Sequence, residues 1–237
     1  MKRYEILLFD ADNTLFDFSL AERIAFGETA EDAGIPSTDA VYERYSAIND
    51  SLWKALERRE TTLEELKTER FRRLLCELGC PDDAETAARA RRMRERYIES
   101  LSHQACLVDG AEELCRDLAR EYPLYLVTNG ISRIQRSRFD ASALKPYFSG
   151  IFVSEELGEQ KPSPAYFDAV FAAIGNPERD KVLMIGDSLT SDCDGAIAYG
   201  IDICRYNPKN EPDGGRPITY TVTKLSEIRD ILCEGTK

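Results

Sequence analysis

Short apolar runs that end abruptly in small or polar residues recur along the chain. The first, YEILLFDAD, covers residues 4–12 and ends in two aspartates. Similar runs cover 124–130, 182–188 and 201–207, and a shorter one covers 151–154. An apolar run without alternation is typical of a parallel strand that is buried on both faces. We therefore expect these segments to form a parallel sheet whose strands end at polar residues.

Segments with helical periodicity separate these runs, as in residues 111–121 and 164–174. Alternation of buried strands with helices predicts an α/β fold in which helices cover both faces of the sheet. The fold class that the pattern favours is therefore a doubly wound parallel sheet. Residues 207–217, NPKNEPDGGRP, lack either periodicity and predict a loop.

The alternation breaks down after the first run, where several amphipathic helical patterns follow one another without a strand. Thr62 and Glu65 have the spacing of a capping box, leucines follow at helical spacing, and Gly79 predicts the end of that helix. We therefore expect an inserted helical domain. The expected domains are an α/β core of residues 1–16 and 104–237 and a helical insert of residues 17–103.

Composition and charge narrow the classes of function. The chain has 237 residues, enough for one domain and a smaller insert. Its net charge of −12 argues against a protein that grips a nucleic acid polymer, since that affinity comes from Lys and Arg. No apolar run approaches the ~20 residues that span a bilayer, so we expect no membrane segment. Seven cysteines without a CxxC pair fit reduced thiols and a cytoplasmic location. No pattern indicates the oligomeric state.

Polar side chains follow several of the expected strands. In an open parallel sheet, ligands bind outside the carboxyl ends of the strands, so these side chains should converge. A single strand-end aspartate could be only a helix N-cap, but four acids in the same placement favour a site. Clustered carboxylates repel one another, and Mg²⁺ is the usual cation where a phosphate shares the site. The residues expected to converge are Asp10, Asp12, Thr128, Asn129, Asp187 and Asp192.

These residue types suit phosphoryl transfer, which needs a nucleophile, neutralised phosphate oxygens and a proton for the leaving oxygen. Asp10 can attack as a carboxylate, and Asp12 can first donate a proton and later activate water. Thr128 offers a hydroxyl and Asn129 a backbone N–H to the phosphate. Lys161 supplies a positive charge, although a lone Lys before Pro is by itself more often a surface residue.

Four short motifs occur in a fixed order: DADNT at 10–14, TNG at 128–130, KP at 161–162 and GDSLTSD at 186–192. In this order, with a helical insert after the first motif, the chain resembles the haloacid dehalogenase superfamily. The resemblance implies a Rossmann-like core and a helical cap that closes over the site.

The same resemblance implies a set of metal ligands. Mg²⁺ would be held by the carboxylates of Asp10 and Asp187 and by the backbone carbonyl of Asp12. Asp192, with Ser188 in the same motif, would support this site indirectly or through a metal-bound water.

Two other activities of related chemistry are less favoured. Superfamily members that cleave carbon–halogen bonds need no acid two residues after the nucleophile, so Asp12 points to phosphate chemistry. Receiver domains of signalling proteins also combine strand-end acids, Mg²⁺, Thr or Ser and Lys. Their phosphoacceptor follows a later strand, and they have no comparable helical insert.

The insert carries the weaker indications about the substrate. YSAIND, SLWKAL and ERFRRLL are similar to the cap of bacterial nucleotidases that dephosphorylate nucleoside monophosphates, notably pyrimidine and non-canonical ones. The implied function is a Mg²⁺-dependent 5′-nucleotidase acting on a small phosphorylated metabolite. A Trp at this position of a helix is more often a core residue than a substrate contact, and Arg70 could be solvated. The candidate substrate contacts are Phe16, Phe18, Asn49, Trp53 and Arg70.

An alternative keeps every core residue and changes only the insert contacts. Under it, the chain is another small-substrate phosphatase of this superfamily, acting on phosphoglycolate or a sugar phosphate, or it is a phosphosugar mutase. The sequence alone leaves that alternative open.

Overall fold

The computed structural model describes residues 3–234, and it divides the chain into two compact units. The core unit comprises the chain up to Phe18 together with the chain from Ala105 onward. The helical unit comprises Ser19–Gln104. Each unit has its own hydrophobic interior and is described separately below.

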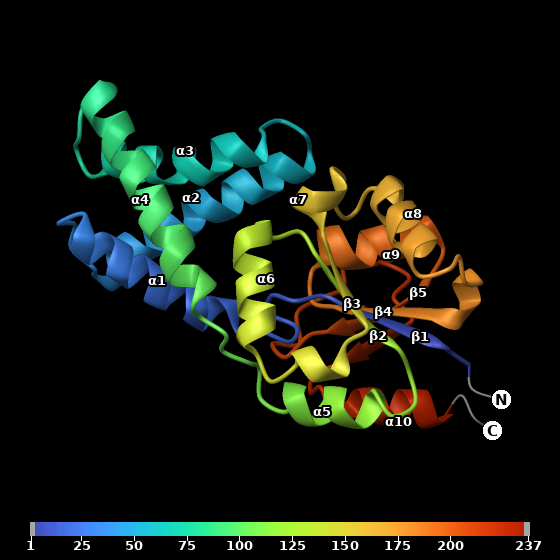
Figure 1. Ribbon diagram of the computed structural model, residues 1–237. Coiled ribbons are helices and arrows are strands. Elements are labelled where there is room, and N and C mark those ends of the chain that lie inside the picture. Colours follow the sequence, from blue (N-terminus) through green and yellow to red (C-terminus); the bar gives the residue numbers. More distant parts are fainter. Residues whose placement is uncertain (1–2, 235–237) are drawn as a thin grey trace. The chain divides into compact units, whose positions relative to one another are not determined.

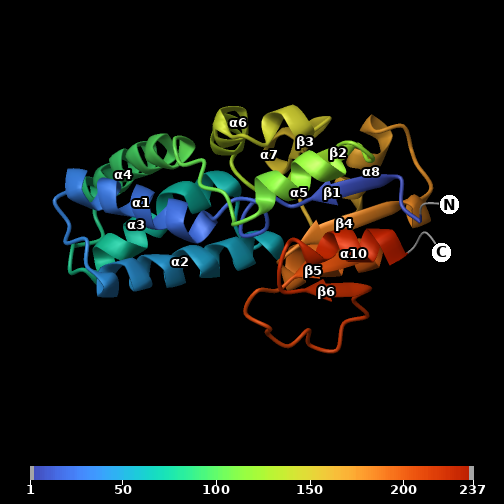
Figure 2. The same cartoon turned by 90° about the horizontal axis from the view of Figure 1, so that it is seen from below.

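The core unit is built on a parallel sheet of six strands in the order β3-β2-β1-β4-β5-β6 (Figure 1). Figure 2 shows the short β6 beside β5 at one end of this sheet. The strand order reverses at β1, which pairs with β2 on one side and β4 on the other. The strands are β1 (Ile6–Phe9), β2 (Leu124–Thr128), β3 (Gly150–Val153), β4 (Val182–Gly186), β5 (Asp202–Tyr206) and β6 (Tyr220–Val222).

Alternate residues of each strand face opposite layers of helices, because successive side chains of a strand point to opposite faces. Leu7 and Phe9 of β1 pack in one cluster with α5 (Ala111–Leu118) and α10 (Glu227–Glu234). Leu8 packs in the other with helices α8 and α9. The bounds of that second pair are Pro164–Ala173 and Asp194–Tyr199. The sheet is therefore covered on both faces, which confirms the expected doubly wound fold.

Shorter elements complete the core unit. They are α6 (Ser132–Ala141), α7 (Ser154–Leu157), two 3₁₀ helices, η1 (Lys145–Tyr147) and η2 (Arg179–Lys181), and a π-helical turn, η3 (Leu189–Cys193). The sequence pattern did not predict β6, α6 or α10. Strand β6 has only three residues and no continuous apolar run, which is why its sequence carries little strand signal.

The helical unit consists of helices, as the pattern predicts. Thr62 and Glu65 form the expected capping box: Glu65 N donates to Thr62 Oγ1 at 3.2 Å and Thr62 N donates to Glu65 Oε2 at 2.9 Å. The helices are α1 (Phe18–Asp32), α2 (Asp39–Glu57), α3 (Leu63–Glu77) and α4 (Ala84–Ser102).

Aromatic rings from all four helices form the interior of the helical unit. Tyr45 lies between Phe26 and Phe71, with ring centroids 4.6 Å and 5.4 Å from its own. Tyr97 of α4 packs against both Tyr45 and Phe71. These large apolar surfaces, buried at the helix contacts, supply most of the stabilisation of such a unit. Among residues 3–234, no helix is long and apolar enough to cross a membrane.

Candidate active site

Asp10 lies at the carboxyl end of β1, the central strand where the sheet order reverses. Its backbone N–H donates to the carbonyl of Ile185 at 2.8 Å, so the residue still belongs to the sheet ladder. The residue is 7% exposed, and its carboxylate accepts a hydrogen bond from Lys161 Nζ at 2.6 Å. Such a reversal point is where open α/β sheets bind ligands. Asp10 is therefore held rigidly at the natural ligand position of this fold.

The ammonium group of Lys161 uses all three of its protons on groups of the core unit. It donates to Asp10 Oδ1 at 2.6 Å, to Asp192 Oδ1 at 2.7 Å and to the Val127 carbonyl at 2.9 Å. The side chain of Asn129 fixes the Lys161 backbone: its Nδ2 donates to the Lys161 carbonyl at 2.7 Å, and its Oδ1 accepts from the Lys161 N–H at 2.8 Å. The side-chain amide of Asn129 thus positions Lys161, and the backbone N–H of Asn129 is the group expected to donate to a phosphate.

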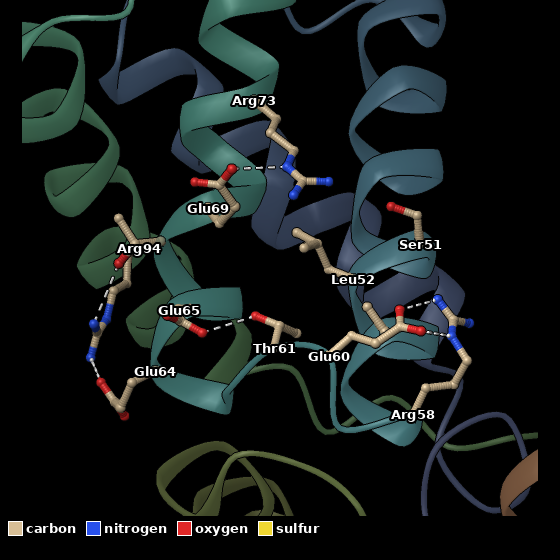
Figure 3. A pocket seen from close by; sticks show the side chains of 12 residues that line it. Ser51, Leu52, Arg58, Glu60, Thr61, Glu64, Glu65, Glu69, Arg73 and Arg94 are labelled. Carbon is tan, nitrogen blue, oxygen red and sulfur yellow. Dashed lines mark hydrogen bonds and ion pairs between the residues drawn. The ribbon is translucent and has the colours of Figure 1, made fainter.

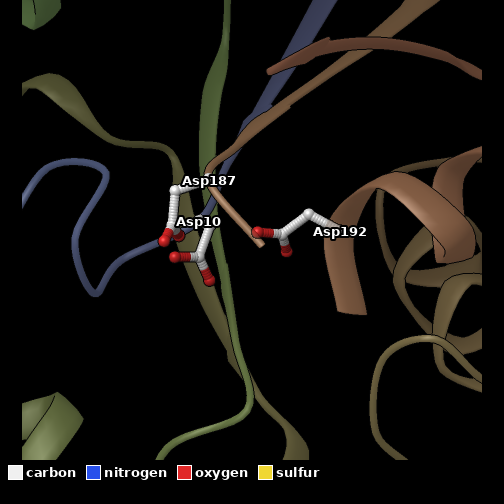
Figure 4. Close-up of side chains that lie close together, drawn as sticks. All are labelled: Asp10, Asp187 and Asp192. Atoms are coloured by element: carbon white, nitrogen blue, oxygen red, sulfur yellow. The ribbon is translucent and has the colours of Figure 1, made fainter. Parts of the chain in front are cut away.

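Three carboxylates converge beside this lysine (Figure 4). We call Asp10, Asp187 and Asp192 the acid cluster, because one oxygen of each lies within 4.8 Å of the others. Asp187 accepts a hydrogen bond from Thr14 Oγ1 at 3.3 Å, and Asp192 accepts one from the backbone N–H of Ser188 at 3.1 Å. The predicted convergence of these acids is therefore present in the fold.

A glycine makes the approach of Asp192 possible. A Cβ at Gly186 would lie 2.3 Å from Asp192 Oδ2, which real Cβ atoms do not tolerate. Ser188 begins the π-helical turn that carries Asp192, and its Oγ accepts from Ser191 N at 3.2 Å. The sequence GDSLTSD thus combines a small residue, a cap and two acids in one tight turn.

The charges of the acid cluster are out of balance. Burial raises the pKa of Asp10 well above its ordinary range, and Lys161 opposes that shift only in part. Burial, reinforced by the charge of Asp192, raises the pKa of Asp187 to about 7. Burial alone lowers the pKa of Lys161, but the charges of Asp10 and Asp192 outweigh it and raise that pKa, so the lysine stays charged. One cation among three carboxylates leaves a deficit, and an all-oxygen donor set suits a hard divalent ion.

Asp12, two residues after Asp10, has different partners. Its Oδ1 accepts from Arg138 Nη1 at 2.6 Å, and its Oδ2 accepts from Gln135 Nε2 at 2.6 Å. Both partners come from α6 and were not among the predicted site residues. Their signal in the sequence is slight: they are polar residues three apart on a helix face that also buries Ile134 and Phe139.

Thr128 lies at the end of β2 and is 2% exposed. Its Oγ1 accepts a hydrogen bond from the Gly130 N–H at 3.2 Å, which orders the TNG turn after the strand. The hydroxyl proton of Thr128 is not used in that bond. The Thr128 hydroxyl can therefore still donate to an anion at the strand end, and its role as a phosphate donor stays a prediction.

Phe16 and Phe18 are two of the candidate substrate contacts, and their rings lie against Arg138. The guanidinium carbon of Arg138 is 4.8 Å from the ring centroid of Phe16 and 5.9 Å from that of Phe18. Phe16 is 1% exposed and belongs to the core cluster beneath the sheet. In this structure Phe16 therefore offers no free face for a base.

Two of the three candidate contacts of the helical unit, Asn49 and Arg70, have partners within it. Arg70 and Asn49 are each 2% exposed, and Arg70 Nη1 donates to Asn49 Oδ1 at 3.2 Å. Asn49 Nδ2 donates to Glu22 Oε1 at 2.9 Å. Trp53 is half-buried. Asn49 thus links a buried acid to a buried arginine, and a substrate role for these residues stays a prediction.

A separate pocket of about 920 Å³ lies within the helical unit (Figure 3). It is lined by residues of α2, α3 and α4 and of the loop between α2 and α3, and it includes no strand-end acid. The three arginines on its wall are engaged with acids of the same wall. The pairs are Arg58 with Glu60, Arg73 with Glu69 and Arg94 with Glu64.

Comparison with known proteins places this geometry in context. Residues 4–200 match the model of the haloacid dehalogenase-like hydrolases. The chain is 42% identical to the HAD-hydrolase YfnB of Bacillus subtilis, over 98% of this chain and 97% of that protein. It also resembles a crystal structure of YfnB bound to magnesium, with a TM-score of 0.89 and 40% identity over 98% of this chain and 99% of that one.

Two further relatives carry names that describe an activity. The pyrimidine 5′-nucleotidase PynA of Streptococcus pneumoniae is 37% identical over 97% of this chain and 95% of its own length. The pyrimidine 5′-nucleotidase YjjG of Escherichia coli is 30% identical over 98% of this chain and 99% of its own length. All three similarities extend over the core unit and the helical unit alike.

Proposed function

Since the chain belongs to the haloacid dehalogenase-like hydrolase family, we propose that it is a Mg²⁺-dependent phosphomonoester hydrolase with Asp10 as its nucleophile. The observation that carries the proposal is the buried Asp10 carboxylate, held 2.6 Å from Lys161 within an acid cluster at the reversal point of the sheet. An oxygen nucleophile in such a place can attack phosphorus without competition from bulk water.

In the first half of the proposed reaction, an Asp10 oxygen forms a bond to phosphorus while the bond from phosphorus to the leaving oxygen breaks. Asp12 donates its proton to that leaving oxygen, and the alcohol departs. In the second half, Asp12 takes a proton from water as the water attacks phosphorus. The bond from Asp10 to phosphorus then breaks, and inorganic phosphate leaves, with Asp10 again a carboxylate and Asp12 again protonated.

The remaining residues bind and orient the phosphate. The carboxylates of Asp10 and Asp187 and the backbone carbonyl of Asp12 would hold Mg²⁺, and Asp192 would support them. When bound, Mg²⁺ supplies the positive charge that the acid cluster lacks and that a phosphate dianion requires. The Thr128 hydroxyl and the Asn129 N–H donate to phosphate oxygens.

For the substrate, we propose a nucleoside monophosphate with a pyrimidine base. The support is similarity along both units to two proteins named pyrimidine 5′-nucleotidases. The helical unit is the part of the chain expected to contact the leaving group, and it is included in those similarities. The seven cysteines are all free thiols, which supports a reducing, cytoplasmic setting for this activity.

The experiment that tests this substrate class is phosphate release from a panel of esters with Mg²⁺ present. We expect kcat/KM for dUMP, UMP and dTMP to exceed that for phosphoglycolate and glucose phosphates by at least about tenfold, or ~1.4 kcal/mol. Equal or higher kcat/KM values on the non-nucleotide esters would contradict the nucleotidase proposal and leave the phosphatase proposal intact. Conversion of one sugar phosphate isomer into another, without phosphate release, would indicate a mutase.

The nucleophile is tested by Asp10→Asn, which changes one oxygen for an NH₂ group at nearly constant shape. We expect phosphate release to fall below detection and no phosphoenzyme to accumulate, with the circular dichroism spectrum unchanged. Asp140→Asn is the matched control, because Asp140 forms an exposed ion pair with Lys145 and should be dispensable. Turnover by Asp10→Asn above a tenth of the wild-type rate would contradict the proposed role.

A further inference from the structure

We propose that Gln135 and Arg138 are positioning residues for Asp12: they hold its carboxylate in one orientation, and Arg138 also balances its charge. This inference rests on the proposed function, because it concerns the proton-transferring group of that reaction. It assigns a task to α6, a helix that contributes no residue to the predicted site.

The contacts leave Asp12 little freedom. Each carboxylate oxygen accepts a bond of 2.6 Å, one from Arg138 Nη1 and the other from Gln135 Nε2. Bonds this short to a carboxylate are typical of charge-assisted pairs. With its two oxygens bonded to two different side chains, Asp12 cannot rotate about its terminal bond without losing both partners. A group that must face a leaving oxygen benefits from such a fixed plane.

Arg138 is itself rigidly held. The residue is fully buried, and its guanidinium lies over the rings of Phe16 and Phe18. Phe16 and Asp12 also form a backbone bridge with each other, and Asn13 N donates to the Phe16 carbonyl at 2.7 Å. The turn that contains Asp12 and the rings that pack against Arg138 are therefore joined by backbone contacts. A buried guanidinium that packs on aromatic rings would destabilise the fold if no negative charge lay beside it.

An independent observation comes from Gly130, the last residue of the TNG motif. A Cβ at this position would lie 2.1 Å from Gln135 Nε2 and 2.4 Å from Gln135 Cγ. The side chain of Gln135 thus passes through the space that any other residue would fill. The glycine is needed so that Gln135 can reach Asp12, which ties this motif to the proton-transferring residue as well as to the phosphate.

The second task of Arg138 concerns charge. While Asp12 carries its proton, the three carboxylates of the acid cluster face the cations Lys161 and Arg138, and a bound divalent cation leaves this set with one positive charge, which favours a phosphate dianion. Without Arg138 that positive charge is lost, so phosphate binding should weaken as well. Once Asp12 has given up its proton, Arg138 is the cation that neutralises it.

A double-mutant cycle tests the inference, because a residue that acts through Asp12 loses its effect when Asp12 is absent. Arg138→Met is compared with wild type, and again in an Asp12→Ala background, with the best nucleotide and with 4-nitrophenyl phosphate. We expect Arg138→Met to lower kcat on the nucleotide at least tenfold. On the nitrophenyl ester, whose leaving group needs no proton, the loss should be several-fold smaller. In the Asp12→Ala background, Arg138→Met should cost less than twofold further in kcat.

Arg136→Met is the matched control on the same helix, because Arg136 pairs with Glu156 at the surface. It should keep the wild-type kcat on both esters. Arg138→Lys keeps the positive charge. We expect its KM to return closer to the wild-type value than its kcat does. A purely structural role of Arg138 would change KM and kcat together.

If Arg138→Met does not fold, two milder variants decide the question. Gln135→Met keeps the length of the side chain without the NH₂ donor, and Gly130→Ala displaces Gln135. Each variant should lower kcat more on the nucleotide than on the nitrophenyl ester. The double variant, Gln135→Met with Gly130→Ala, should lose no more kcat than the worse of the two single variants.

The inference is overturned if these variants keep wild-type kcat, or if their losses are equal on both esters and in both Asp12 backgrounds. That result, with an active wild type, leaves the proposed function standing. A wild type that hydrolyses neither ester with Mg²⁺ overturns the proposed function, and the inference with it.

Discussion

At Lys161, one buried ammonium group lies between the carboxylates of Asp10 and Asp192. Removing it with Lys161→Met leaves two buried acids without a protein cation, a change that typically costs about 3–5 kcal/mol. We expect urea unfolding in EDTA to show that loss, and the loss to grow as the pH rises and the carboxylates ionise. Lys145→Met, which breaks an exposed pair with Asp140, should cost less than about 0.5 kcal/mol. A Lys161→Met protein as stable as wild type at pH 8 would contradict the charge balance described here.

Glu22 is the buried acid of the helical unit, and it should make the stability depend on pH. Burial raises its pKa from 4.5 to about 7, although Tyr42 and Asn49 donate to it and Arg70 lies near. Because the folded state holds the proton more tightly than the unfolded chain, its contribution is fully present below pH 4.5 and is lost as the pH rises to about 7.

Comparison of wild type with Glu22→Gln measures this effect. The free energy of unfolding of wild type should fall relative to that of Glu22→Gln between about pH 4.5 and pH 7, by up to ~3 kcal/mol, and stay level above pH 7. Glu31→Gln, on an exposed part of the same helix, should follow wild type at every pH. Parallel curves for wild type and Glu22→Gln would show that folding leaves the pKa of Glu22 unshifted.

At the scale of elements, the capping box of α3 is the local signal that the structure reproduces most directly. Thr62→Ala removes the side-chain acceptor for Glu65 N and should lower the free energy of unfolding by about 0.5–2 kcal/mol. The Tm from differential scanning calorimetry should fall, while kcat stays at the wild-type value. Thr61→Ala removes only the bond from Thr61 Oγ1 to Glu65 Oε2, at 3.2 Å, and keeps the acceptor for Glu65 N, so it should shift the Tm less. Equal shifts for the two variants would mean that the Thr62 acceptor contributes no more than this neighbouring bond.

Helix α6 shows the opposite case at this scale. Its inward face carries Gln135 and Arg138 in places where apolar side chains normally pack, so its pattern resembles a solvated helix more than a buried one. The reason is that its polar groups are satisfied by Asp12, which lies 123 and 126 residues away in the chain. Local periodicity contains no information about a partner at that separation.

For the whole molecule, the main prediction concerns Mg²⁺. Because the acid cluster lacks positive charge, Mg²⁺ should bind the folded state and not the unfolded chain. At a concentration of 100 times its dissociation constant it should add about 2.7 kcal/mol to the free energy of unfolding. EDTA should abolish phosphate release, and MgCl₂ should restore it.

Asp187→Asn is the informative variant for this metal effect, since it removes one acid of the cluster and one proposed ligand. Its Tm in EDTA should equal or exceed that of wild type, because repulsion within the cluster is relieved. Its Tm should respond much less to MgCl₂. A full Mg²⁺ response in Asp187→Asn would place the cation elsewhere.

The sequence by itself determined strands β1 to β5 of the core unit, the helical character of the insert and the strand-end acids that include the acid cluster. It could do so because buried strands, helix caps and strand-end acids are recognised from residues that are neighbours in the sequence. In a parallel sheet the carboxyl ends of the strands lie at one edge, so the strand-end acids come together. Only the tertiary structure decided the partners of these groups. Lys161 binds Asp10 as well as Asp192, Phe16 supports Arg138, and Gln135 passes over Gly130 to reach Asp12. Those contacts depend on how side chains from distant segments fill one small buried space, where charge and volume must be satisfied together.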